Sequence, residues 1–435
     1  MPFYSIITDF KIENFEKLKE IIPLNDTKII TNDYSIQEQI QDLGYKVEHI
    51  ESRFGFVNDK IYSIYEKSVK NTEMLYKHLQ EVRYMDVPLI DGLKFFVLIY
   101  LIFLEQVKSI LEEKKNCVFI FPNTEYHFFA IEDIAQNLGY ETKLGISYIT
   151  NSDLVRLNFD GTNKSHSRFL YHDTRYLYDK SVEIRKEEDE ISNILLHLQI
   201  DDVKYAFFLN DNLYGLYLKP VLPLIRMFEQ NKTKFDIFTL DEWSSKWLTE
   251  KGLKIHNLTE FIDKISRITL QEYNYILNFI DRMQIFETDD PLLQSFCKIF
   301  RNDAMARYLS RIMAVINVID YVFDKSKVKS VILALDGGSP DNDIVSSVSK
   351  KHKITTNSIM IQSITQHLPY LGYILNADRI FVGGKRLKKE LIELGVENKR
   401  LVITGNPRYD YIQSLPSHRK EQKGKRNHIL VGISR

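Results

Sequence analysis

The fold class is decided by the segment that runs from Tyr205 to Leu258. It holds three short, mostly apolar runs, Tyr205–Leu209 (YAFFL), Phe235–Thr239 (FDIFT) and Leu253–Leu258 (LKIHNL). Stretches with helical spacing separate the runs, and Gly252 precedes the third, where a helix that ends in the left-handed conformation favours glycine. Apolar runs that alternate with helices are typical of a parallel sheet covered on both faces. The segment therefore predicts a β-α-β-α-β unit.

The same pattern occurs earlier in the chain, within residues 1–150. Its three runs are Ser5–Thr8, Thr27–Thr31 and Tyr45–Ile50, and Gly44 precedes the third. In both copies a long helical insertion follows, at about residues 59–114 and 267–326, and strands then return. The returning strands are Asn116–Phe121 and Thr142–Ile146 in the first copy, and Lys329–Leu335 and Ser358–Ile361 in the second. This order predicts an internal duplication.

We expect an α/β protein with two Rossmann-like parallel-sheet units that carry helical insertions. The first unit spans residues 1–150 and is a divergent duplicate, 151–203 form a polar connector, and 204–412 form the second unit. Residues 413–435 combine a polar, basic linker with one strand. Because a parallel strand needs a crossover to reach its neighbour, we expect this strand to open a third, truncated unit that continues beyond Arg435.

Composition limits the classes of function. The chain has 435 residues, of which 44% are apolar and 12% aromatic, as in a folded multi-domain protein. Its 58 basic and 59 acidic residues leave a net charge of -1, so no overall field favours nucleic acid. Two cysteines, Cys117 and Cys297, give neither a disulfide framework nor a cysteine zinc site. We expect a cytoplasmic protein without a metal or cofactor.

The most apolar stretch is Phe95–Leu104, and charged residues bracket it. It is too short to span a bilayer, and no apolar secretory segment opens the chain. We therefore interpret Phe95–Leu104 as a buried helix of a globular core, the alternative being an interfacial segment.

One segment near the C-terminus carries a family resemblance. It reads Asp378-Arg-Ile-Phe-Val-Gly-Gly, then a helical stretch, Gly395-Val, and finally Val402-Ile-Thr-Gly-Asn-Pro-Arg-Tyr-Asp410. This segment resembles the signature that ends the N-terminal domain of GT-B glycosyltransferases of surface-polysaccharide pathways. In a related form it also resembles non-hydrolysing UDP-N-acetylglucosamine 2-epimerases. The resemblance covers about residues 204–435 and does not extend to 1–203.

The resemblance implies a GT-B fold in which the second unit binds the acceptor and the following domain binds a nucleotide sugar. It implies a glycan or lipid-linked acceptor, and peripheral association with a membrane stays open. Gly405, Asn406, Pro407, Arg408 and Asp410 match the signature at the hinge that faces the cleft between domains. We expect Asn406, Arg408 and Asp410 to bind substrate. The alternative from the residues alone is a turn in which Arg408 pairs with Asp410.

Three further candidate residues follow two predicted strands of the second unit, at the edge where open α/β sheets bind ligands. Asp336 stands in Asp-Gly-Gly-Ser-Pro-Asp341, between a strand and a helix, and is a candidate catalytic base. The alternative is a turn in which Ser339 caps the helix and Pro340 begins it. His367 is a candidate general base and Gln362 a candidate substrate ligand, although related enzymes often have Gln-His-Gly where this chain has Gln362-Ser363. The alternative for His367 is a surface or hydrogen-bonded structural histidine.

A cluster of basic residues, Lys385, Arg386, Lys388 and Lys389, opens a helix. Glu390 and Glu393 lie four residues after Arg386 and Lys389, so we interpret this cluster as a solvated helix face, the alternative being an anion-binding lip.

Three functions remain open at the level of sequence. We expect glycosyl transfer in the synthesis of a surface polysaccharide or glycan. The first alternative is a UDP-N-acetylglucosamine 2-epimerase-like enzyme, and the second is a non-catalytic sugar-binding or scaffold module.

Overall fold

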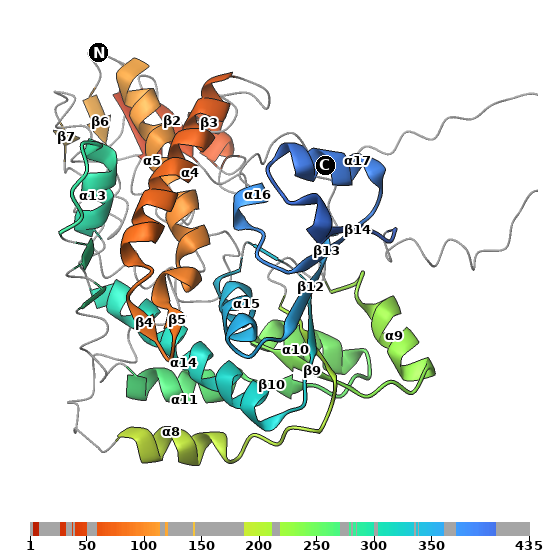
Figure 1. Cartoon of the computed structure of the whole chain (residues 1–435). Helices are drawn as coiled ribbons and strands as arrows, with labels where there is room; N and C mark the ends of the chain where they lie inside the picture. Colours follow the sequence, from red (N-terminus) through yellow and green to blue (C-terminus); the bar gives the residue numbers. More distant parts are fainter. Residues whose placement is uncertain are drawn as a thin grey trace, which may run out of the picture.

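The computed structural model contains two parallel sheets and the helices that cover them (Figure 1). The structure describes residues 3–7, 27–31, 37, 40–49, 59–113, 118–120, 142–143, 187–210, 218–269, 278–279, 282–283, 285–299, 303–334, 336–337, 339–360 and 371–405. None of the helices in these ranges is both long enough and apolar enough to cross a membrane.

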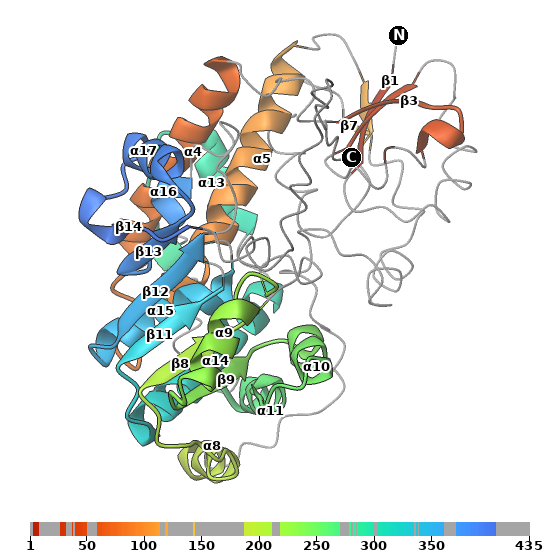
Figure 2. The same cartoon turned by 90° about the vertical axis from the view of Figure 1, so that its right-hand side faces the viewer.

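The larger sheet has seven strands in the order β10-β9-β8-β11-β12-β13-β14. The strands are β8 (Tyr205–Phe208), β9 (Phe235–Thr239), β10 (His256–Asn257), β11 (Ser330–Leu333), β12 (Thr355–Met360), β13 (Arg379–Val382) and β14 (Leu401–Ile403). Every neighbouring pair is parallel, and Ser330 of β11 lies opposite Tyr205 of β8. Figure 2 shows β8, β11, β12, β13 and β14 side by side. This is the strand order of a doubly wound, Rossmann-like sheet.

The smaller sheet repeats this topology with five parallel strands in the order β3-β2-β1-β6-β7. They are β1 (Phe3–Ile7), β2 (Thr27–Thr31), β3 (Lys46–His49), β6 (Val118–Ile120) and β7 (Thr142–Lys143). When the strands of each sheet are numbered as they occur along the chain, both sheets have the spatial order third, second, first, fourth, fifth. The larger sheet continues with its sixth and seventh strands. Gly44 and Gly252 have φ values of 90° and 76°, as expected where each preceding helix ends. The prediction of two Rossmann-like units is confirmed, whereas the domain boundaries stay a prediction.

Helices cover both faces of the larger sheet because side chains of a strand alternate between faces. Phe207 points into a cluster with α9 (Leu222–Gln230) and α10 (Glu242–Glu250). Phe208 points into a second cluster with helices on the other face. Those helices are α11 (Thr259–Thr269), α14 (Asp303–Lys325) and α15 (Pro340–Lys351). The outer strands β13 and β14 have their own small core with α17 (Lys385–Glu393).

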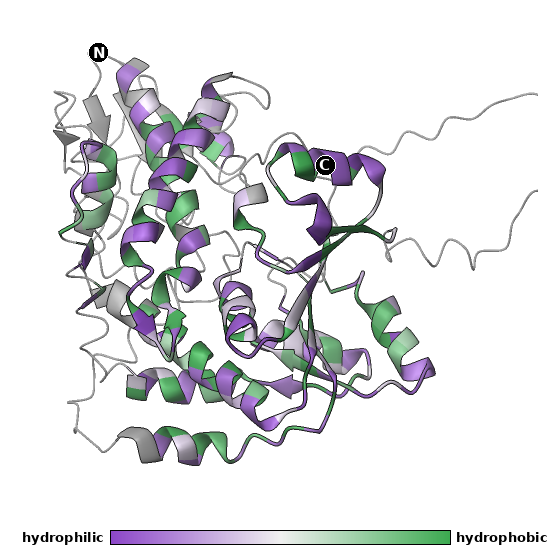
Figure 3. Cartoon of the chain, in the orientation of Figure 1, coloured by the Kyte–Doolittle hydropathy of each residue, from purple (hydrophilic) through white to green (hydrophobic). Residues whose placement is uncertain are grey.

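Both helical insertions are present, and they pack against each other. The first contains α4 (Asp59–Leu79), the short strands β4 (Arg83–Tyr84) and β5 (Val87–Pro88), the 3-10 helix η2 (Leu89–Gly92) and α5 (Lys94–Glu113). The second contains α11, α13 (Pro291–Ile299) and α14. Figure 3 shows hydrophilic and hydrophobic residues together on α4, as expected for a helix with one face in a core.

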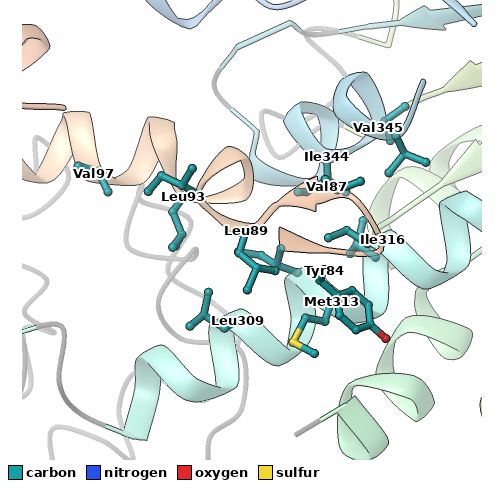
Figure 4. Packing of buried hydrophobic residues seen from close by; sticks show 14 of the residues in the cluster. Tyr84, Val87, Leu89, Leu93, Val97, Leu309, Met313, Ile316, Ile344 and Val345 are labelled. Carbon is teal, nitrogen blue, oxygen red and sulfur yellow. The ribbon is translucent and has the colours of Figure 1, made fainter. Parts of the chain in front are cut away.

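One hydrophobic core joins the two insertions. Figure 4 shows Leu309, Met313 and Ile316 of α14 beside Tyr84, Val87 and Leu89 of the first insertion, with Ile344 and Val345 of α15 nearby. Ile30 of the smaller sheet belongs to the same buried cluster. The Phe95–Leu104 stretch lies in α5, where Leu98, Leu101 and Leu104 are fully buried, which confirms its interpretation as a core helix.

Polar contacts also tie the first insertion to the second. The Lys67 ammonium of α4 lies 3.0 Å from the Asp290 carboxylate, and Asn71 donates a hydrogen bond of 3.2 Å to the same carboxylate. The Asn317 amide of α14 donates to the Tyr84 hydroxyl at 2.9 Å inside the core. The first insertion is thus an integral part of the second unit's packing.

Because of this shared core, Leu101→Ala should lower the free energy of unfolding by about 2–5 kcal/mol, the usual cost of truncating a buried leucine. Met74→Ala is the control, since Met74 lies on the neighbouring helix α4 with 38% of its surface exposed; its cost should stay within about 0.5 kcal/mol. Urea denaturation of both variants measures the difference. Equal losses in the two variants would contradict the shared core.

Candidate functional site

The candidate site lies at the carboxyl edge of the larger sheet, where the strand order reverses between β8 and β11. In open α/β sheets this reversal opens the crevice in which ligands bind. Asn210 follows β8 and is buried; its amide donates to Asn342 Oδ1 of α15 at 3.1 Å, and its oxygen accepts from the Leu240 N–H at 2.7 Å. These contacts join the ends of β8 and β9 to the start of α15.

Asp336 stands next to this reversal and is only 4% exposed. Its two carboxylate oxygens accept hydrogen bonds from the backbone N–H groups of Asn376 and Ala377, each at 2.9 Å. Arg400 binds the same stretch from its carbonyl side, with donors 2.9 Å from Leu375 O and 2.7 Å from Ala377 O. A carboxylate and a guanidinium therefore hold residues 375–377 through their backbone.

The turn between Asp336 and α15 has the geometry that the sequence predicts. Ser339 occupies the N-cap position with φ of -135° and ψ of 117°, and Pro340 begins the helix, although the Ser339 hydroxyl makes no capping hydrogen bond. Gly337 has φ of 67°, and a Cβ atom there would lie 2.4 Å from Ile374 O. Glycine is therefore required both by the backbone angle and by the close approach of α16 (Leu371–Ile374).

A cluster of buried and half-buried polar groups surrounds Asp336 where the first insertion meets the second unit. We call Lys94, Asp91, Asp336, Asp343 and Asn376 the seam cluster. Lys94 opens α5; its ammonium donates to Tyr373 O at 2.7 Å and lies 4.0 Å from the centre of the Tyr373 ring. Asp343 Oδ1 accepts a hydrogen bond of 2.7 Å from the Asn376 amide.

Asp91 anchors the other side of the seam cluster. Its Oδ1 accepts from the Tyr76 hydroxyl of α4 at 2.7 Å, and its Oδ2 accepts from the Ser347 hydroxyl of α15 at 2.6 Å. One carboxylate thus connects a helix of the first insertion to a helix of the second unit, in a region of low exposure.

Burial is the largest cause of the pKa shifts of Asp343, Asp336 and Lys94. It raises the pKa of the Asp343 carboxyl well above the ordinary value, and the neighbouring Asp336 carboxylate acts in the same direction, against Lys94. Burial also raises the pKa of Asp336, despite the two backbone donors. It lowers the pKa of the Lys94 ammonium, although Asp343, Asp91 and Asp336 all act to raise it. The site therefore collects groups with displaced pKa values beside the switch point, as functional sites often do.

The contacts of Asp336 are those of a positioning residue. Both of its oxygens already accept backbone N–H donors, and its surface is nearly closed to solvent. Its assignment as a catalytic base stays a prediction that these contacts do not support. Gln362, His367, Asn406, Arg408 and Asp410 lie outside the described residues.

The basic residues of α17 adopt the arrangement that their spacing predicts. Arg386 pairs with Glu390 at 2.8 Å and Lys389 with Glu393 at 3.6 Å, and both basic side chains are largely exposed. Lys388 donates to Leu401 O at 2.9 Å. The interpretation of this cluster as a solvated helix face is confirmed.

Sequence reasoning missed most of the seam cluster. In the sequence Lys94 and Asp91 stand out only as charged residues before an apolar stretch, and nothing in the sequence indicates a role for Asn376. The signal for Lys94 is its position at the start of the most apolar helix in the chain, where a charge must find a buried partner or stay at the surface.

Gly337→Ala should destabilise the protein more than Gly395→Ala. The control residue Gly395 also has a positive φ, 88°, but a Cβ there meets nothing within 4 Å. Gly395→Ala should therefore lower the free energy of unfolding only by the cost of the left-handed conformation, about 1–2 kcal/mol. At Gly337 the clash with Ile374 O adds to that penalty. Chemical denaturation compares the two, and equal losses would show that α16 moves aside at little cost.

The raised pKa of the Asp343 carboxyl predicts how the stability of the protein depends on pH. Since its pKa is higher in the folded than in the unfolded chain, the folded protein binds more protons between the two values. The free energy of unfolding should then fall as the pH rises from about 4 through the folded pKa, by at most about 1.4 kcal/mol per pH unit. Asp343→Asn, which mimics the protonated acid, should flatten this slope.

The control for Asp343→Asn is Asp341→Asn, which removes a charge from the same end of α15, where Asp341 pairs with Arg311 at 3.0 Å. Denaturation curves between pH 4 and pH 8 provide the slopes. If the slope is unchanged in Asp343→Asn, the proton is taken up by another group and the prediction is wrong.

Comparisons with known proteins add little beyond this geometry. No model of a known protein family matches the sequence, and no curated protein is similar to it. Among solved structures, UDP-GlcNAc 2-epimerase from Methanocaldococcus jannaschii aligns with 94% of this chain and 95% of its own, at 10% identity and a TM-score of 0.19. At that TM-score the alignment does not establish a common fold, so the Rossmann-like description of this chain stands on its own strand order and register.

Proposed function

We propose that this protein takes part in glycosyl transfer to a surface polysaccharide or glycan, with the second unit on the acceptor side and a nucleotide sugar as donor. The observation that supports this most is the structural context of the segment that resembles the GT-B signature. Arg379–Val382 forms β13, Lys385–Glu393 forms α17, and Leu401–Ile403 forms β14 at the outer end of the parallel sheet. Gly405 then has φ of 85°, so the backbone leaves the extended conformation just after β14.

This context matters because a motif has meaning only where the chain places it correctly. Carboxyl ends of parallel strands share one edge of a sheet, which is the edge where α/β proteins bind ligands. Asn406, Arg408 and Asp410 follow the carboxyl end of β14 in sequence, directly after Gly405. Gln362 and His367 follow the carboxyl end of β12, two strands away in the same sheet. The proposal places all five residues at one ligand-binding edge.

Each residue then has a chemical role in the proposal. His367 removes the proton from the acceptor hydroxyl, since imidazole is the side chain best suited to proton transfer near neutral pH. Arg408 presents a planar fork of donors to a phosphate or to negative charge that develops on the leaving group. Gln362, Asn406 and Asp410 bind hydroxyl groups of the sugar. Asp336 and Arg400 act as positioning residues, because they hold the backbone that follows the His367 segment.

The epimerase-like alternative rests on the same signature, which both classes of enzyme share. Product analysis separates the alternatives. The full-length protein is incubated with UDP-, GDP- and CMP-sugars, with and without a glycan acceptor, and products are followed by phosphorus and proton NMR. Acceptor-dependent release of the nucleotide supports glycosyl transfer. A changed sugar on an intact nucleotide supports epimerisation. Saturable binding without turnover supports a sugar-binding module. No interaction with any nucleotide sugar contradicts these three outcomes and leaves only the scaffold module.

Arg408→Ala in the full-length protein should reduce turnover about 100-fold, the usual loss when a donor to developing charge is removed, while the melting temperature stays unchanged. Arg386→Ala is the matched control, because its guanidinium is 90% exposed and pairs only with Glu390 of the same helix in the described structure. This control should keep full activity. If the Arg408→Ala variant is fully active, the Gly405–Asp410 segment has no role in substrate binding and the proposal for it is wrong.

A further inference from the structure

Three side chains of types that can bind a metal ion come together near the amino ends of β8 and β9, whereas Asp336 follows the carboxyl end of β11. Asp201 precedes β8, Asp236 is the second residue of β9, and His256 is the first residue of β10. One ligand atom from each residue lies within 4.8 Å of the other two. The three segments come together because β8, β9 and β10 are successive neighbours in the sheet.

Two of these side chains carry polar atoms with no hydrogen-bond partner. The Asp236 side chain is only 4% exposed, and its Oδ2 has no partner among the described residues. His256 Nε2 lies 3.4 Å from Asp236 Oδ1 but likewise makes no hydrogen bond. A buried carboxylate oxygen without a partner is costly, and such groups in native proteins usually contact an ion or a bound water.

The imidazole of His256 is held in a fixed orientation. Its ring stacks on Phe238 of β9, with ring centres 5.1 Å apart and an interplanar angle of 27°. Phe238 belongs to the buried core, so the stacked ring has little freedom to rotate. A fixed imidazole nitrogen beside a buried carboxylate is the geometry of a preorganised pair of metal ligands.

Asp201 supplies the third ligand from the exposed side. Its Oδ2 accepts a hydrogen bond of 2.7 Å from the Lys254 ammonium, in a pair that is exposed on both partners. Exposed ion pairs of this kind contribute little to stability. Lys254 therefore competes weakly for Asp201, and a bound cation would displace it or share the carboxylate with it.

We propose that Asp201, Asp236 and His256 bind a divalent transition-metal ion, with Zn²⁺ as the ion that suits the ligand set best. One imidazole nitrogen and two carboxylates form the mixed nitrogen and oxygen donor set that Zn²⁺ accepts, whereas Mg²⁺ and Ca²⁺ favour oxygen alone. Asp201 and Asp236 place the site near the amino ends of β8 and β9, away from the ligand-binding edge, and His256 joins them from its position opposite Phe238 of β9. Its role is therefore structural: the ion joins the segment before β8 to β9 and β10.

The proposal is independent of glycosyl transfer, so its test uses metal binding only. The full chain is freed of metal with a chelator and titrated with Co²⁺, whose visible absorption reports coordination, and Zn²⁺ is then added as a competitor. The wild-type protein should bind one equivalent of Co²⁺ and release it to Zn²⁺. Asp236→Asn and His256→Gln should each weaken binding at least tenfold, with the Co²⁺ absorption lost.

The matched control is His352→Gln. His352 Nε2 lies 2.7 Å from Asp320 Oδ1, and Lys351 pairs with the same oxygen, so this site repeats the His, Asp and Lys groups without a third ligand among the described residues. His352→Gln should keep wild-type binding of Co²⁺. Equal losses in His352→Gln and His256→Gln would mean that the histidines affect binding only through folding, and the proposal would be wrong.

Two exposed residues keep the test valid if the buried variants fail to fold. Asp201→Asn should weaken Co²⁺ binding several-fold without a change in circular dichroism, because Asp201 is a surface residue. Lys254→Met should strengthen binding, since it removes the competitor for Asp201. If Lys254 and the three proposed ligands form only a network of ion pairs, Lys254→Met leaves the metal affinity unchanged. That result, or a wild-type protein that binds no Co²⁺ saturably, would overturn the proposal.

Discussion

The arrangement of this protein follows from one constraint, that parallel strands must bury both of their faces. On one face of the larger sheet, α9 and α10 suffice to cover Phe207 and Ile237. On the other face α14 covers Phe208, but a helix of 23 residues that is apolar around much of its surface needs cover of its own. The first insertion supplies it through Tyr84, Val87 and Leu89. The two units are therefore linked by packing as well as by the chain.

This packing also explains why charges are buried beside the switch point. The seam between α5 and α15 closes over Asp91, Lys94 and Asp343, which each have polar partners there. Desolvation makes such a cluster a weak source of stability compared with an apolar contact of the same size. It does fix the relative position of the pieces, because Asp91 can accept from both Tyr76 and Ser347 in one arrangement only. The polar seam specifies how the insertion docks, and the apolar core stabilises it.

The regular parts of the fold could be predicted from sequence because each depends on local pattern. Runs such as Tyr205–Leu209 and glycines such as Gly44 and Gly252 identify strands and helix ends one segment at a time, and the repetition of their order reveals the second sheet. Polar residues inside strands are harder. β12 begins at Thr355, three residues before the expected Ser358. The extra polar residues fit inside the sheet because the side chains of Thr356 and Asn357 find hydrogen-bond partners there, Asp378 for Thr356, and Ser330 and Val331 O for Asn357.

Contacts that join distant segments could not be predicted at all. The docking of the first insertion on α14 connects residues more than 200 positions apart, as in the hydrogen bond between Asn317 of α14 and Tyr84 of β4, where the separation is 233 positions. The group of Asp201, Asp236 and His256 was not predicted either, because the pattern places β8, β9 and β10 in one unit but does not fix the register that brings these side chains together. Histidines that are far apart in sequence argue against a local metal motif only; they do not argue against ligands that a sheet brings together.

The positioning contacts around Asp336 suggest how a site on loops can still be precise. Residues 361–370 begin where β12 ends and finish where α16 begins. Beyond α16, Asp336 and Arg400 hold the backbone of 375–377, and Asp378 exchanges hydrogen bonds with Thr356 of β12 itself. Both flanks of 361–370 are thus fixed to the same sheet. A segment fixed at both ends loses fewer conformations when it binds a ligand, and less binding energy is spent on ordering it. In the proposed mechanism Asp336 and Arg400 therefore act through the backbone of residues 375–377, and not on the reacting atoms themselves.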